Sequence, residues 1–75
     1  MTLDKHLIDG IGGFKEKVLP ATQFEELMTN AGYSQIGSAP AQGGGFKFWW
    51  AHEIFNNVES IYSNDKSTVI TAYHV

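Results

Sequence analysis

The chain has 75 residues, a net charge of −3 and no cysteine, so it fits one domain that neither disulfides nor thiolate metal sites can stabilise. All five basic residues are lysines, which argues against a nucleic-acid interface because such interfaces need a basic surface with arginine contacts. The hydrophobic fraction of 43% and the aromatic fraction of 13% exclude intrinsic disorder.

Residues 1–19 predict a first helix, with Thr2 as its N-cap. Its apolar residues recur at helical spacing and would form one stripe. Three glycines at positions 10–13 interrupt it, each costing about 1 kcal/mol relative to alanine, and can divide the helix in two. Pro20 is expected to end this segment. The stripe consists of Leu3, Leu7, Ile11, Phe14 and Val18.

Residues 22–31 predict a second, amphipathic helix. Thr22 and Glu25 match a capping box, in which each side chain satisfies a free amide of the first turn. Gly32 follows directly and suits the left-handed conformation that closes many helices. The predicted buried face consists of Phe24, Leu27, Met28 and Ala31.

The second half of the chain predicts strands. Residues 33–36 form a candidate short strand, and residues 37–45 a flexible loop of glycine, alanine and proline. Residues 46–51 predict a strong strand, because aromatic residues favour a pleated, half-buried surface. Its side chains alternate between two faces. One face carries Phe46, Phe48 and Trp50, and the other carries Lys47, Trp49 and Ala51.

Residues 58–62 and 68–75 predict two further strands, joined by the turn-forming residues 63–67. The expected fold is therefore a single α+β domain over residues 1–75. Two N-terminal helices (residues 1–32) pack on one face of a three- to four-stranded antiparallel sheet, whose C-terminal part (residues 46–75) is a β-meander. The last strand is expected at an edge of the sheet, where another strand can add.

No part of the sequence approaches the roughly 20 apolar residues that span a bilayer. Residues 1–5 lack the charged and apolar pattern of a signal peptide. The expectation is a cytoplasmic protein without contact to a membrane.

A short sheet covered by helices on one face leaves its other face open, and apolar residues there favour a partner. The sequence therefore predicts a small, acidic, non-catalytic domain that binds protein, as a regulator or inhibitor or as a homodimer. No cofactor and no metal are expected. Aromatic residues usually carry interface affinity. The predicted anchors are Trp49, Trp50, Phe55, Tyr62 and Tyr73.

The alternative is an enzyme that uses His52, Glu53 and His74 for acid–base chemistry. Residues 67–74 resemble the last strand of some small bacterial toxin nucleases, which would imply a ribonuclease-like toxin. Such chemistry also needs a cation for the phosphate, and Lys47 is the only one in the predicted sheet.

Two further interpretations concern ligands. Three histidines can form a zinc site when they converge, but His6, His52 and His74 lack the i, i+4 spacing of a helical metal motif. Ordinary surface or interface histidines are the expected outcome. A small-ligand pocket between the helices and the sheet is the remaining possibility.

Overall fold

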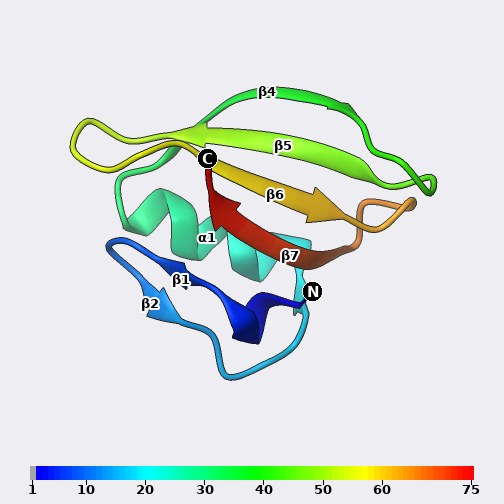
Figure 1. Ribbon diagram of the computed structural model, residues 1–75, viewed down its shortest axis with the longest axis horizontal. Helices are drawn as coiled ribbons and strands as arrows, with labels where there is room; N and C mark the ends of the chain where they lie inside the picture. The colour runs from blue at the N-terminus through cyan, green and yellow to red at the C-terminus, as the bar shows by residue number, and fades with distance from the viewer. Residues whose placement is uncertain (1) are drawn as a thin grey trace.

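The computed structural model describes residues 2–75, and these contain one α-helix and two antiparallel sheets (Figure 1). The larger sheet has five strands in the order β3-β7-β6-β5-β4, and a separate two-stranded hairpin pairs β1 with β2. The elements in chain order are η1 (Leu3–Lys5, a 3-10 turn), β1 (Leu7–Ile8), β2 (Gly12–Gly13), β3 (Leu19–Pro20), α1 (Ala21–Asn30), β4 (Ser34–Pro40), β5 (Phe46–Ala51), β6 (Val58–Tyr62) and β7 (Thr68–His74).

Strands β5, β6 and β7 form the predicted meander, and β5 and β6 have the predicted bounds. Alternating burial in β6 agrees with a sheet that has one face in the core. The last strand stops at His74, one residue before the prediction.

The predicted first helix is wrong, and with it the expectation of two helices on a three- to four-stranded sheet. Residues 2–20 instead form η1, the β1–β2 hairpin and β3. Gly10 and Gly12 have φ values of +89° and +98°, which an α-helix does not allow. The apolar residues at helical spacing do not form one buried stripe either, because Leu7 is 73% exposed while Leu3 is fully buried.

Helix α1 ends as predicted but begins differently. Gly32 has φ +96°, and the amides of Gly32 and Tyr33 donate to the carbonyls of Thr29 and Met28. This pair of bonds is a Schellman motif. At the other end, Pro20 precedes the helix rather than ending an earlier one.

The predicted capping box does not form. Thr22 lies inside the first helical turn, and no side chain caps the helix. The backbone amide of Ala21 donates to the carbonyl of Ser67 instead, over 2.8 Å. Glu25 is then free to accept a hydrogen bond from the hydroxyl of Tyr62, at 2.9 Å.

The glycine-rich segment is more ordered than predicted, because residues 37–40 belong to β4. Register pairs Gly37 with Trp49 and Pro40 with Phe46, and an irregularity lies between Gln35 and Gly37. Strand β4 is an outer strand of the large sheet, whereas β7 lies between β3 and β6. The expectation that the last strand is an edge is therefore wrong.

Helix α1 covers one face of the large sheet. Phe24 of the helix packs edge-on against the rings of Trp50 and Tyr62, with centroids 6.1 and 6.4 Å apart. Leu3 and Ile8 of the N-terminal segment join the same core. In Figure 1 helix α1 passes behind β7, and the N-terminal hairpin lies beside the helix. No helix of the described residues covers the other face of the sheet. Within residues 2–75 no helix has the length and apolar character needed to cross a bilayer.

Candidate functional site

The face of the large sheet opposite α1 is the first candidate site, and we call it the open face. Strand pairing places Trp49 beside Glu59 on β6, and Glu59 beside Tyr73 on β7. These side chains are half-buried although no helix covers them. By register and alternation, the open face consists of Ser34, Gly37, Ala39, Lys47, Trp49, Ala51, Glu59, Ile61, Tyr73 and the buried Thr71.

The carboxylate of Glu59 links the aromatic residues of the open face. One oxygen accepts a hydrogen bond from the indole nitrogen of Trp49 at 2.9 Å, and the other accepts from the hydroxyl of Tyr73. The Lys47 ammonium lies 4.0 Å from this second oxygen. The Glu59 side chain is only 14% exposed. The result is an aromatic surface whose central carboxylate is balanced by donors of the same face.

These contacts change the acidity of both partners. The hydrogen bond from Tyr73 is the main cause that holds the pKa of Glu59 below its usual value, with smaller contributions from Trp49 and Lys47 opposing the effect of burial. The same hydrogen bond, with burial second, raises the pKa of Tyr73 to about 12. At neutral pH the carboxylate is thus ionised and the phenol protonated, which is the arrangement that the bond requires.

The predicted anchors fall in three places. Trp49 and Tyr73 lie on the open face, whereas Trp50 and Tyr62 are 3% and 1% exposed in the core beneath α1. The indole of Trp50 donates to the hydroxyl of Ser60 at 3.1 Å, so its polar atom is satisfied internally. Phe55 lies in the loop between β5 and β6, with its ring centroid 4.6 Å from that of His52. The open face therefore holds two of the five.

His52 holds the loop that follows β5. Its Nδ1 accepts hydrogen bonds from the amides of Ile54 at 3.0 Å and Phe55 at 3.5 Å. Because Nδ1 accepts, Nε2 carries the proton and donates to the carbonyl of Ala31 at 2.9 Å. The ring is also in contact with Tyr33, with centroids 4.8 Å apart. Both nitrogens are thus occupied by backbone groups.

His74 connects the N-terminal hairpin to the sheet. Its Nε2 accepts from the amide of Asp9 at 2.9 Å, and its Nδ1 donates to the carbonyl of Asn56 at 3.0 Å. The Asp9 carboxylate lies 3.5 Å from Nε2. His74 therefore has the same kind of backbone-bridging role as His52, at a different junction.

The acid–base hypothesis has little geometric support from these contacts. A general base needs a nitrogen that can reach a substrate proton, and the nitrogens of His52 and His74 are engaged with the backbone. Glu53 is exposed. In the described part of the chain, no three histidine, aspartate or glutamate residues gather closely enough to hold a metal ion. His6 packs instead against the ring of Tyr73, with centroids 5.6 Å apart.

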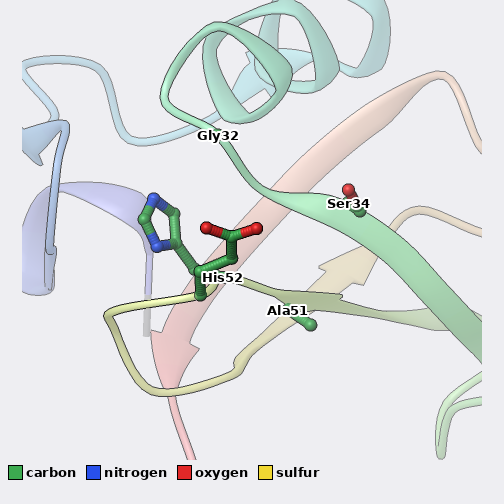
Figure 2. Close-up of a pocket in the computed structure, with 5 residues that line it drawn as sticks. Gly32, Ser34, Ala51 and His52 are labelled. Carbon is green, nitrogen blue, oxygen red and sulfur yellow. The ribbon is translucent and has the colours of Figure 1, made fainter.

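A shallow pocket of about 540 Å³ lies where α1 ends and β4 and β5 meet (Figure 2). Gly32 follows the helix, Ser34 begins β4, and Ala51 and His52 lie at the end of β5. Glu53 completes the lining. This pocket lies at one end of the sheet rather than between helix and sheet, where the sequence placed a possible ligand site.

Sequence reasoning placed Lys47 on the same face as Trp49 but missed Glu59 as a member of the site. A signal for Glu59 was present, since it is the single charged residue in a strand whose other members are apolar or small and polar. A carboxylate in mid-strand is costly unless donors surround it. The donors, however, come from two other strands, and only the register brings them together.

Comparison with known proteins identifies no relative: no protein-family model matches the chain, and no curated protein or solved structure matches it either.

Proposed function

We propose that this protein is a small non-catalytic binding domain that acts through the open face of its sheet, and that the first occupant of this face is a second copy of the chain. The observation that carries the proposal is the group formed by Trp49, Tyr73 and Glu59. Two aromatic rings are fixed at the surface by one shared carboxylate, without a helix to cover them.

This group is suited to an interface for two reasons. Its rings are held by hydrogen bonds, so that little side-chain entropy is lost on binding. Its one carboxylate already has the donors of Trp49 and Tyr73 and the nearby Lys47, so that covering it leaves no unpaired charge. Trp and Tyr are also the residue types that most often dominate binding energy.

The size of the face favours a weak rather than a permanent dimer. The molecule measures 31 × 26 × 20 Å. A stable interface buries about 800 Å² on each partner, which would need nearly all of the broadest side of this molecule. Isologous pairing of the open faces brings together surfaces of balanced charge, although each chain carries −3.

The test is the solution mass by light scattering across a range of concentrations. We expect the mass to rise from monomer to dimer, and Trp49→Ala and Ala39→Glu to hold the protein as a monomer. Ala39→Glu adds a carboxylate to the open face, opposite Lys47, and keeps the hydrogen bond from Trp49 to Glu59. The matched control is Leu7→Ala, which removes an exposed apolar side chain on the N-terminal hairpin.

Circular dichroism of each variant checks that the fold is kept. A wild-type protein that stays monomeric at every concentration would contradict self-association, and a dimer that both open-face variants leave unchanged would place the interface elsewhere.

A further inference from the structure

The pocket at the end of α1 contains one ionisable group that the fold does not use. Its polar lining consists of Ser34, His52 and Glu53. His52 is fully engaged with the backbone of Ala31, Ile54 and Phe55. Within residues 2–75, the carboxylate of Glu53 takes part in no hydrogen bond and no ion pair, and no lysine lines the pocket.

We propose that this pocket binds an arginine side chain of a partner protein, with Glu53 as the residue that recognises the guanidinium group. A carboxylate and a guanidinium pair through two parallel hydrogen bonds, which gives both energy and geometric specificity. The hydroxyl of Ser34, on the other side of the pocket, can accept from a remaining N–H of the same group. The pocket adjoins the open face, because Ala51 belongs to both, so its occupancy has to be tested on the monomer.

The residue after Glu53 supplies an apolar surface for the stem of the arginine. Ile54 is 80% exposed, the highest value among the exposed large apolar side chains of the described residues. Folding gains nothing from such a position. Arginine lays its methylene groups along apolar surface while its charged end pairs elsewhere, so a carboxylate next to an exposed isoleucine matches both parts of that side chain.

The loop that presents Glu53 and Ile54 is fixed before any partner arrives. His52 accepts the amides of both Ile54 and Phe55 and donates to the end of α1, so the loop is attached to the helix. A site held in this way loses less conformational entropy on binding than a mobile loop. Gly32 also lines the pocket and leaves room for the imidazole, because a Cβ there would lie 2.9 Å from Nε2.

The experiment is a titration with the peptide acetyl-Gly-Arg-Gly-amide, followed by amide chemical shifts in two-dimensional NMR. The same peptide with citrulline in place of arginine is the control ligand, since it keeps the shape and loses the charge. The variant is Glu53→Gln. The matched control variant is Glu26→Gln, which makes the same change at an exposed position of α1.

We expect saturable shifts at Gly32, Ser34 and residues 51–54 with the arginine peptide, and weaker ones with the citrulline peptide. Glu53→Gln should weaken binding roughly tenfold, the value of one charge-assisted hydrogen bond, and Glu26→Gln should not. Equal binding of both peptides, equal binding by Glu53→Gln, or shifts that do not saturate would each overturn the proposal.

Free arginine amide is titrated in parallel. If it binds as tightly as the peptide, the pocket takes a small guanidinium compound rather than a protein side chain, and the assignment of the partner is wrong. All titrations are made at a concentration where light scattering gives the mass of the monomer, so that a dimer on the open face, which shares Ala51 with the pocket, cannot cover the site.

Discussion

Glu59 shows how a carboxylate can be accommodated inside a sheet. An isolated carboxylate in a half-buried position would be costly. Here Trp49 and Tyr73 donate to its two oxygens from the strands on either side. The carboxylate thus fixes two rings that would otherwise have free rotamers, and the organisation of the open face depends on its ionisation.

Protonation of Glu59 at low pH should destabilise the open face. Because the folded pKa of Glu59 lies below its ordinary value of 4.5, its contribution to stability is present above that value and is lost as the pH falls through the folded pKa. The indole N–H resonance of Trp49 should report this titration with a midpoint below 4.5. The indole of Trp50, bonded to Ser60, is the internal control.

The variant Glu59→Gln tests the same contact at neutral pH. We expect it to abolish the acid titration of the Trp49 resonance and to lower the free energy of unfolding by about 1.5–3 kcal/mol, the range for hydrogen bonds to a charged group. Hydrogen bonds from Ser63 and Ser67 lower the pKa of Asp65 to about 2. Because Asp65 titrates in the wild type and in Glu59→Gln alike, it does not affect the difference between them. A Trp49 midpoint at or above 4.5 in the wild type would refute the role given to Glu59.

The end of α1 places two requirements on one glycine. Gly32 adopts φ +96°, and its missing side chain leaves space for the imidazole of His52. Gly43 has a similar φ of +85° in the turn between β4 and β5, but nothing lies within 4 Å of the place where its Cβ would be. Substitutions at these two glycines therefore distinguish the cost of backbone strain from the cost of steric contact.

We predict that Gly43→Ala costs only the backbone term, about 1 kcal/mol. Gly32→Ala should cost more, about 2–3 kcal/mol, because the new methyl group also displaces His52 from the carbonyl of Ala31. Urea unfolding of both variants measures the difference. Equal losses would mean that the His52 contact adds nothing to the stability of this junction.

Elements with a simple period were predictable from the sequence, whereas the N-terminal hairpin, whose turn depends on the conformation of Gly10 and Gly12, was not. Strands β5 and β6 follow from alternation and aromatic content, and the end of α1 follows from Gly32. The N-terminal segment has apolar residues at helical spacing, but the left-handed conformations of Gly10 and Gly12 turn it into a hairpin. Spacing alone does not reveal which glycines take positive φ.

The candidate site was predictable only in part, because it depends on tertiary packing and strand register as well as on local sequence. Alternation correctly separates Trp49 from Trp50, so the sequence already placed these two rings on opposite faces. Which face α1 covers depends on tertiary packing, and this decides that Trp50 and Tyr62 are core residues while Trp49 and Tyr73 are not. The meeting of Glu59 with its donors depends on the register of three strands.

The N-terminal segment closes the core of the protein. The amide of Leu3 donates to the carbonyl of Lys17, and the hydroxyl of Tyr33 donates to the carbonyl of Asp9 at 2.6 Å. His74 joins Asp9 to the last strand. The radius of gyration is 11.1 Å, close to the roughly 11 Å expected for a compact chain of this length. Stability is nevertheless limited, because a domain this small buries a low share of its surface.

The last prediction follows from that limited stability. If the open face pairs with a second copy, the dimer stabilises the folded state by mass action, and Tm must rise with protein concentration. We expect thermal unfolding to shift upward by several degrees over a hundredfold increase in concentration, since about 1 kcal/mol moves Tm by roughly 4–8 °C in a domain of this size. Ala39→Glu should remove the concentration dependence while leaving Tm at low concentration nearly unchanged, because Ala39 lies on the open face opposite Lys47 and takes no part in the hydrogen bonds of Glu59. A Tm that is independent of concentration in the wild-type protein would show that the fold is stable as a monomer and that its aromatic face is not covered by another copy of itself.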